Sequence, residues 1–361
     1  MALETLSRET ASFYAPRFEI EIQGTKLKAD IGKAILDVSV EEKENEGVSF
    51  KMTVHDEFDM EKQEFKWLEH PLFKENNKVT IKVGYGTELS TMIIGKITSI
   101  ESSFFAGDAP TISIGGQDLA FEKIKTTSKE RTYVDKSYSD IAKEIAGEAG
   151  LTPEVDGVPK FESVVRKKSD QSYYTFLQDL AKKAGGYKFF VNGNTMFFSK
   201  TGEDKKEILT LELKKDIISF RPTFKTTGLL TEVEVRGHDP DNPGTPVVGR
   251  ATAGSEKAQE PDKKPGSEAV EGERKKVITD VVVRSVEEAN ALAKAELDKA
   301  SDTLIEGEGE CIGITQLRAG VNIRLEKMGK RFSGKYYVKA TTHTINDSGY
   351  RTKFSVKRNA A

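Results

Sequence analysis

The chain has 361 residues, more than one hydrophobic core usually organises, so two or three domains are expected. Its 55 basic and 58 acidic residues nearly cancel to a formal charge of -3, so no global field attracts nucleic acid or anionic lipid, and proteins are the expected partners. The single cysteine, Cys311, excludes an internal disulfide and a cysteine-based metal cage, and is most simply a small core residue. No N-terminal segment has the pattern of a membrane span or a secretory signal.

The N-terminal part of the sequence predicts a β domain preceded by a flexible arm. Residues 1–17 show no convincing period and form the expected arm. Between 18 and 125, short runs such as FEIEI, VSFKMTV and VTIKVGY alternate apolar and polar residues and are separated by Gly, Asn and Asp. This period of two predicts the first antiparallel β-barrel domain. Residues 56–73 interrupt it with a helical or irregular excursion that packs on the barrel rim.

Residues 126–204 change period and predict a small α+β module. A first helix runs from a cap at Ser137 to a stop at Gly150. A second helix spans 170–184, with Ser169 or Asp170 as its cap. Its apolar stripe includes Phe176, Leu177 and Leu180, and Gly185 and Gly186 end it. The sequence Asn192-Gly193-Asn194 then predicts a hairpin within residues 187–198.

Residues 205–358 predict a second β-barrel domain, because alternating runs resume at 208. Residues 250–276 contain almost no large apolar side chain, so this insert is expected to be disordered, mobile and dispensable. A helix over about 285–300 follows, with Ser285 and Glu288 in the spacing of a capping box. The predicted fold class is α+β, mainly β, with two antiparallel β-barrels flanking the small module.

The sequence carries no convincing catalytic, cofactor or metal site. His55, His70, His238 and His343 have no second His or Cys at ligand spacing. Residues 238–242 could offer oxygens to calcium, but a turn between strands is the more economical reading. No nucleophile motif occurs, and pairing any two of the many carboxylates would be arbitrary. The basic clusters at 166–168 and 274–276 have acidic neighbours and read as solvated surface.

Several stretches resemble a known family in their order and spacing along the chain. They are SYSDIAKEIAGEAGLTPEV, KKSDQSYYTFLQDLAKKAGGYKFFVNGNTMFFSK, MIIGKITSIESSF, GGQDLAFEKIK, SVEEANALAKAEL and LRAGVNIRLEKMGKRFSGKYYVKATTHTINDSGYRTKFSVKR. Together they resemble the late control gene D protein family of contractile-tailed phages, which is also the hub portion of VgrG spike proteins. The resemblance covers residues 18–358 apart from the insert. The structural positions that carry it are Gly95, Asp118, Ser169, Asp170, Phe176, Leu177, Leu180, Gly186, Gly320, Gly334, Tyr336, His343, Gly349 and Tyr350.

The resemblance implies a non-enzymatic baseplate hub without cofactors, assembled in the bacterial cytoplasm into a virion or phage-tail-like particle. In that family two barrels per subunit alternate in a homotrimer, giving a six-like ring for the hexameric inner tube. The middle module then faces the trimeric spike, and other baseplate components surround the hub. Because the sequence ends at Ala361 without an OB-fold or β-helix, the spike is expected to be a separate polypeptide.

Two other functional classes remain open on sequence grounds. A carbohydrate- or peptidoglycan-acting β-rich enzyme of a tail would need convergent carboxylates or a metal set. A tail component that contacts passing DNA would need a basic stripe, which the balanced charge disfavours. The sequence leaves open whether the particle is a phage tail, a bacteriocin-like tail or an effector-injecting system.

Overall fold

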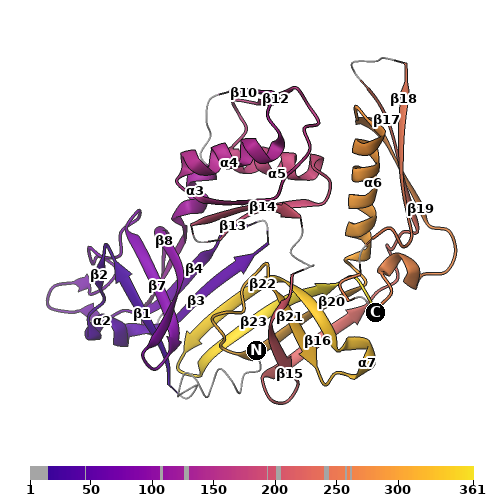
Figure 1. The fold of residues 1–361 in the computed structure, drawn as a ribbon. Helices are drawn as coiled ribbons and strands as arrows, with labels where there is room; N and C mark the ends of the chain where they lie inside the picture. The colour runs from indigo at the N-terminus through magenta and orange to yellow at the C-terminus, as the bar shows by residue number, and fades with distance from the viewer. Residues whose placement is uncertain are drawn as a thin grey trace.

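The computed structural model describes residues 15–44, 46–105, 109–125, 130–192, 194–200, 205–239, 244–256, 258–260 and 262–361 (Figure 1). The fold is mainly β and is organised around one 13-stranded sheet. A small α+β module and a lateral subdomain with one long helix rise from the same side of this sheet (Figure 1). No helix among the described residues is long and apolar enough to cross a membrane.

The main sheet is built by two halves of the chain. The first half contributes β1 (Pro16–Ile22), β2 (Thr25–Lys26), β3 (Ile35–Lys43), β4 (Ser49–His55), β7 (Lys78–Tyr85), β8 (Glu88–Ser103) and β9 (Thr111–Asp118), with the short helix α2 (Ala29–Ala34). The second half contributes β15 (Glu207–Glu212), β16 (Ile217–Phe224), β20 (Ile305–Ile312), β21 (Asn322–Glu326), β22 (Gly334–Asn346) and β23 (Gly349–Arg358), with α7 (Gly329–Phe332). The order is β16-β20-β23-β22-β3-β4-β9-β8-β7-β1-β2, while β21 pairs with β22 and β15 with β21.

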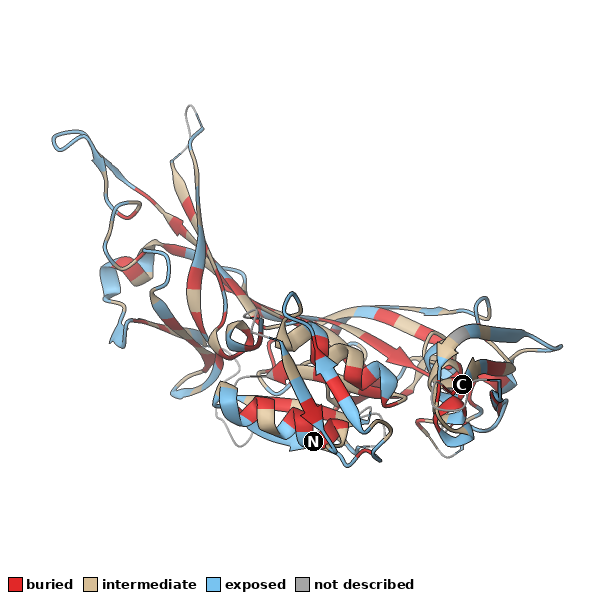
Figure 2. Cartoon of the chain, turned by 90° about the horizontal axis from the view of Figure 1, so that it is seen from above, coloured by how far each residue is buried: buried red, intermediate tan, exposed pale blue. Residues whose placement is uncertain are grey.

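The two halves meet where β3 pairs with β22, so they share one sheet. This antiparallel pairing runs from Ala340 opposite Lys43 to Asn346 opposite Asp37. No pairing among the described strands joins the two ends of the order, so the two separate barrels expected from the sequence are not confirmed. Alternation along the strands buries one side chain in two, as the red segments of Figure 2 show. Each half therefore encloses an apolar core, and Ile345 and Tyr350 of the second half contribute to the core of the first.

The N-terminal region differs from the expectation in detail. Residues 1–14 of the expected flexible arm lie outside the described residues, and β1 already begins at Pro16. The excursion over 56–73 is irregular rather than helical, with a two-strand hairpin of β5 (Phe58–Asp59) and β6 (Glu64–Phe65). Asp56 holds it by accepting the backbone N–H groups of Trp67 and Leu68 at 2.8 and 3.1 Å. Trp67 enters the core of the first half.

The middle module packs three helices on a small sheet. Its elements are α3 (Leu119–Lys125), β10 (Arg131–Val134), α4 (Tyr138–Ala149), β11 (Thr152–Val155), β12 (Val164–Lys167), α5 (Tyr173–Lys183), β13 (Tyr187–Asn192) and β14 (Thr195–Lys200). Helix α4 begins and ends as predicted: Ser137 and Asp140 form a capping box, and Gly150 adopts φ +69°. The predicted hairpin is confirmed by the pairing of β13 with β14.

The cap of α5 is a correction to the sequence prediction. Ser169 and Asp170 are exposed in the turn before the helix, and the N-cap is Ser172, whose hydroxyl accepts the N–H of Thr175 at 3.1 Å. Serine at the N-cap bonds a free N–H of the first turn, so the nearest Ser to the helix start has the advantage. The stripe of Phe176, Leu177 and Leu180 is buried in the module core, as expected.

The lateral subdomain contains β17 (Glu232–His238), β18 (Pro246–Thr252), β19 (Lys275–Val282) and α6 (Val286–Ser301). Helix α6 lies on β17 and β18, where Val233 and Val235 contact the buried side of the helix. Ser285 caps α6 by accepting the Glu288 N–H at 3.1 Å. The Glu288 carboxylate accepts the N–H of Arg284 at 2.8 Å, one residue before the capping-box position.

The expectation of disorder over 250–276 is wrong for the described residues of this segment. It begins in β18, contains the 3-10 turn Gly266–Ala269 and ends in β19. Between these strands, the described residues of 253–274 form a strap across the C-terminal end of β23. Gln259 and Asn359 exchange hydrogen bonds at 2.9 and 3.2 Å, and Glu260 pairs with the fully buried Arg358 at 2.9 Å. Hydrogen bonds and ion pairs between buried polar groups hold the strap in place. The prediction of disorder was wrong because it took only the burial of apolar side chains into account.

Phe176→Ala should destabilise the module. Phe176 is buried and its ring stacks on Tyr133 at 5.9 Å between centroids, so truncation leaves a cavity and should cost about 3 to 5 kcal/mol. Phe104→Ala is the matched control, because Phe104 is 58% exposed and its loss should cost under about 1 kcal/mol. Denaturant unfolding measures both; equal small losses would mean that α5 does not support the core.

Glu260→Ala should show whether the strap stabilises the second half. Removing this carboxylate leaves the buried Arg358 guanidinium without its ion pair, which should cost about 3 kcal/mol. Glu271→Ala removes the same group from an exposed strap position and should change the unfolding free energy by less than about 0.5 kcal/mol. If calorimetry finds the two variants alike, the strap contributes nothing to stability.

Candidate assembly surfaces

The loop between β20 and β21, residues 313–320, is the principal contact between the two halves beyond their shared sheet. We call it the seam loop. Its Arg318 forms an ion pair with Glu42 of β3 and donates to the Met92 carbonyl of β8 at 2.9 Å. Glu42 is only 2% exposed, and burial raises the pKa of its carboxyl while Arg318 opposes that rise. Either charge alone would be costly at this depth, so the pair fixes where the loop sits.

The first half contacts the seam loop at a second point. The Tyr85 hydroxyl of β7 donates to the Gly313 carbonyl at 2.9 Å. Ser90 and Thr315 lie within hydrogen-bonding distance of each other, at 3.3 Å. The loop therefore contacts β3, β7 and β8, which belong to three different positions in the first half of the sheet.

The second half also contacts the seam loop, through a buried histidine. His343 of β22 has Nε2 at 2.9 Å from the Leu317 carbonyl and Nδ1 at 2.8 Å from the Tyr350 hydroxyl. A carbonyl only accepts, so Nε2 carries the proton and Nδ1 accepts from Tyr350. Burial raises the pKa of Tyr350, which keeps its hydroxyl protonated, and lowers the pKa of His343 to about 3.

The module meets both halves at the end of the seam loop. Gly320 adopts φ +89°, and a Cβ added there would lie 3.3 Å from the Phe190 ring of β13. On the same strand, Lys188 pairs with Glu44 and lies 4.6 Å from the centre of the Tyr337 ring. The space left between the three parts is about 10 Å³, room for about one water molecule. All three parts are therefore in direct contact here.

The structure brings some of the predicted motif positions together and separates others. Gly320, His343 and Tyr350 lie at the seam loop, and Gly349, with φ +106°, forms the turn before Tyr350. Asp118 ends β9 opposite Gly95 and accepts the N–H of Ala120 at 2.7 Å, which starts α3. Gly334 and Tyr336 lie far along β22, beside Arg358 and the strap. The remaining positions, Ser169, Asp170, Phe176, Leu177, Leu180 and Gly186, belong to the module around α5.

Sequence reasoning missed Glu42 and Arg318. A signal for Glu42 existed, because Val38 and Val40 occupy the buried phase of β3 and Glu42 continues that phase. A charged residue at a buried position of a strand implies a buried partner. Nothing local identifies Arg318 as that partner, since 276 positions separate the two residues (318 minus 42).

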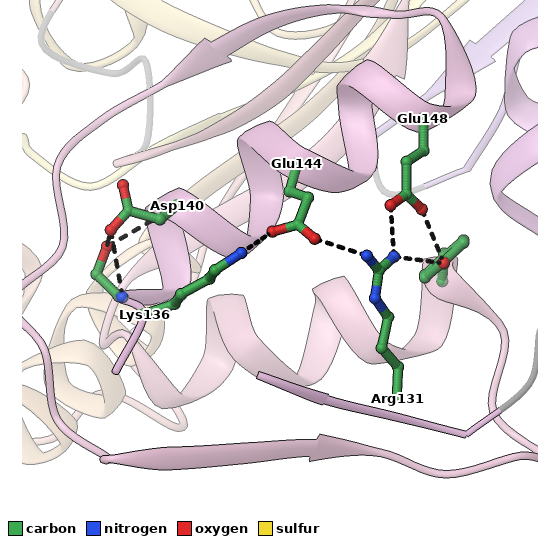
Figure 3. Close-up of polar contacts among 7 residues, drawn as sticks. Arg131, Lys136, Asp140, Glu144 and Glu148 are labelled. Carbon is green, nitrogen blue, oxygen red and sulfur yellow. Dashed lines mark hydrogen bonds and ion pairs between the residues drawn. The ribbon is translucent and has the colours of Figure 1, made fainter. Parts of the chain in front are cut away.

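The far end of the module is fixed by a charged network on α4 (Figure 3). Arg131 of β10 reaches across to Glu144 at 2.7 Å and also pairs with Glu148, while Lys136 pairs with Glu144. The hydrogen bonds of Arg131 with Glu148 and, next, with Tyr173 raise the pKa of Arg131. The network holds β10 against α4, and it leaves Val134 and Val164, which face each other across β10 and β12, exposed.

The lateral subdomain is joined to the module through Glu162. This half-buried carboxylate accepts from the Tyr138 hydroxyl at 2.6 Å and from Lys183 at 2.9 Å, and lies 3.8 Å from Arg284, just before α6. Within the subdomain, Gly249 lets α6 approach β18, since a Cβ there would lie 2.3 Å from the Ala289 backbone. The two parts that rise from the sheet therefore contact each other.

The described residues contain no group of three or more His, Cys, Asp or Glu side chains placed to hold a metal ion. Of the calcium candidate at 238–242, residues 240–242 lie outside the described part of the chain. Cys311 is buried in the core of the second half, as predicted, and burial raises the pKa of its thiol. The open face of the second half carries a shallow groove of about 350 Å³ with Arg221, Glu308 and Lys353 in its lining. The charged side chains that line this groove are both basic and acidic, so the groove has no single preferred charge for a ligand.

Comparisons with solved structures identify the fold. A 43 kDa tail protein of prophage MuSo2 from Shewanella oneidensis superposes with a TM-score of 0.73 at 13% identity, covering 96% of this chain and 99% of that chain. A tail protein from Neisseria meningitidis gives 0.70 at 11% identity, with 96% and 97% covered. A type VI secretion system component from Escherichia coli, described as similar to bacteriophage tail proteins, gives 0.58 at 11%, with 94% and 76% covered. The chain therefore shares the fold of these tail and secretion-system proteins.

The chain belongs to the family described as the Alg8 N-terminal domain, which matches residues 14–347. This family is not the late control gene D family that the sequence resembles, although the tail-protein fold agrees with the broader kind of protein expected. No curated protein matches the chain.

The pKa of His343 gives a test of the seam. In the unfolded chain this imidazole should titrate near 6.5, whereas in the fold its pKa is about 3. Below pH 6.5 the unfolded state takes up a proton that the folded state refuses, so stability present above pH 6.5 is lost toward pH 3. Between pH 7 and 4.5 the loss should be about 2 to 3 kcal/mol.

The matched variant is His343→Gln, which keeps a donor for Leu317 and an acceptor for Tyr350 but cannot titrate. Its unfolding free energy should fall less between pH 7 and 4.5, by the same amount of about 2 to 3 kcal/mol. Acid effects at other groups occur in both proteins and cancel in the comparison. Identical pH dependence would show that His343 accepts a proton in the folded seam.

Proposed function

We propose that the chain is a structural baseplate hub of a contractile tail or injection system. It acts as a homotrimeric adaptor between a hexameric inner tube and a trimeric central spike. The observation that supports this most is the pairing of β3 with β22, which makes two half-sheets of six or seven strands into one continuous sheet.

Doubling a half-sheet within one chain suits a symmetry change. Three copies around an axis present six half-sheets, so a six-fold ring meets six near-equivalent positions on a three-fold body. The seam loop supports this role because the Glu42–Arg318 pair and the His343 contacts hold the angle between the halves. Each chain has one module, so a trimer has three modules. These match a three-fold spike on the side of the hub opposite the tube.

The comparisons support the same assignment at the level of fold. Proteins named for phage tails, and a component named for the type VI secretion system, share the architecture over nearly the whole chain. The assignment extends this likeness to a hub related to the late control gene D and VgrG kind. Its work is done by surfaces, and the described residues contain no group of three or more His, Cys, Asp or Glu side chains that could hold the metal of a metal-dependent hydrolase.

A trimer is the first expected outcome. Purified chain, alone or with its spike, should scatter light as a particle containing three copies, each of 40.0 kDa. A monomer that becomes trimeric when spike or tube protein is added fits equally, since neighbours can complete an assembly. A stable dimer or tetramer in the presence of the spike contradicts the proposal.

Phe176→Ala, which damages the module core, should reduce the amount of spike protein recovered in a pull-down more than the amount of tube protein recovered.

A further inference from the structure

One end of the main sheet carries a cluster of exposed aromatic and thioether side chains, which we call the aromatic tip. Its exposed members are Phe58, Met60, Phe104 and Phe105, and the half-buried Phe65 lies between Phe58 and Phe104. Phe65 lies 4.9 Å from Phe58 and 5.1 Å from Phe104 between ring centres, so hairpin β5–β6 and the end of β8 form one surface. Met60, Phe104 and Phe105 are 75%, 58% and 68% exposed. Contiguous apolar surface of this kind marks a site of interaction.

Strand register places the aromatic tip at the end of the sheet away from the module. His55, just before the β5–β6 hairpin, is the partner of Thr111, and Thr111 is also the partner of Ser103, just before Phe104. The opposite end of β9 is Asp118, from which α3 enters the module. The tip therefore extends beyond the sheet edge opposite the module.

The second half has polar residues at the matching end of its sheet. There the β22–β23 turn lies beside the start of β3, because Asn346 is the partner of Asp37. Asp347 and Ser348 occupy this turn, and both are exposed. The hairpin of the first half and the turn of the second therefore lie at the same end of the sheet but differ in the chemistry of their side chains. Each chain offers one apolar tip and one polar tip at this end.

The rim of the aromatic tip is acidic. Residues 57–66 contain four carboxylates and two lysines, a balance of -2. Lys66 pairs with Glu57 at 2.9 Å and Lys62 with Asp59 at 3.4 Å. Glu61 and Glu64 have no ion-pair partner among the described residues. A complementary surface would be apolar with basic residues around it, and an anionic membrane would be repelled.

The basic, partly apolar surface of this chain itself is badly placed to receive the tip. Val248 and Val277 are exposed on the lateral subdomain, whose Arg236 and Arg250 are also exposed. This subdomain rises on the same side of the sheet as the module (Figure 1), whereas the tip lies at the edge opposite the module. In a closed ring, neighbouring copies meet at equal heights along the axis, so the tip faces an axial partner.

We propose that the aromatic tip inserts into an apolar, basic-rimmed groove on the protein ring that stacks on the hub at the end away from the module. Resting on the proposed function, that ring is the inner tube. Three tips per hub occupy alternate subunits of the six-membered ring and set its rotational register, while the polar turns contact the subunits between them.

The test compares two double variants. Phe104→Ser with Phe105→Ser removes the apolar tip, and Val134→Ser with Val164→Ser removes exposed apolar side chains at the module end as the matched control. Each is measured for thermal unfolding, for mass by light scattering and for binding to the purified inner-tube ring protein of the particle that contains this chain. The tip variant should bind the ring at least about tenfold more weakly, with unchanged folding, trimerisation and spike binding. The control should bind the ring normally.

Charge reversal gives a second route if the tip variant folds poorly. Glu61→Lys with Glu64→Lys keeps the aromatic side chains and should weaken ring binding by about tenfold, with a smaller loss at high salt. Ring binding that is unchanged in both double variants overturns the inference and leaves the hub function intact. A wild-type chain that binds no ring protein overturns the proposed function itself.

Two other results would assign the tip differently. If the tip variant loses its trimer, the tip contacts a second copy of this chain. If wild-type protein sediments with phosphatidylcholine vesicles and the tip variant does not, the tip contacts lipid. Either result contradicts docking to the ring.

Discussion

The buried ion pair of Glu42 and Arg318 is the interaction on which the relative placement of the parts depends. A shared sheet alone would allow the halves to twist about the β3–β22 pairing, since twist between neighbouring strands varies by many degrees. The pair joins the seam loop to Glu42 within this pairing, and the same Arg318 also bonds Met92 on β8, away from it. The cost of burying the two charges is offset only when they meet in one geometry. Met92, Tyr85 and His343 then bond the same loop, so a change at the seam alters several contacts together.

Local signals in the sequence predicted local structure well. Each of these signals acts on the residues next to it: Ser137 and Gly150 mark the two ends of α4, and the sequence at 192–194 predicts the hairpin of β13 with β14, and both the helix and the hairpin are present. The α5 cap was misplaced because Ser169, Asp170 and Ser172 all offer suitable side chains, and only the direction of the incoming chain selects one. The continuous sheet could not be predicted, because β3 and β22 pair across about 300 residues and alternation does not name a strand's neighbour.

The strap shows a different limit of composition. Its sequence lacks large apolar residues, which indicates disorder when burial is the only stabilising term considered. In the fold, Glu256, Gln259 and Glu260 each find partners on α6, β23 or the residue after it. A polar segment can be ordered when its side chains and backbone supply the hydrogen-bond and ion-pair partners that a buried arginine and the end of the chain require. Arg358 at the end of β23 was the available signal, since it continues the alternating apolar phase of Phe354 and Val356, and a charged residue at a buried position requires a partner.

The hairpins and turns at the ends of the strands lie outside the two cores, so they can differ in sequence while the architecture is kept. Tail proteins of only 11–13% identity superpose on this chain with TM-scores of 0.70–0.73, which is expected when alternation and core volume suffice to specify a fold. Turns such as 346–349 and hairpins such as β5–β6 lie outside both cores, so their side chains can change without cost to the sheet. In the proposed trimer, two half-sheets per chain would present six positions to a six-fold ring. Because Phe104 and Phe105 belong to only one half, those six positions would alternate, and an alternating contact would bind a six-fold ring in fewer orientations than a uniform one.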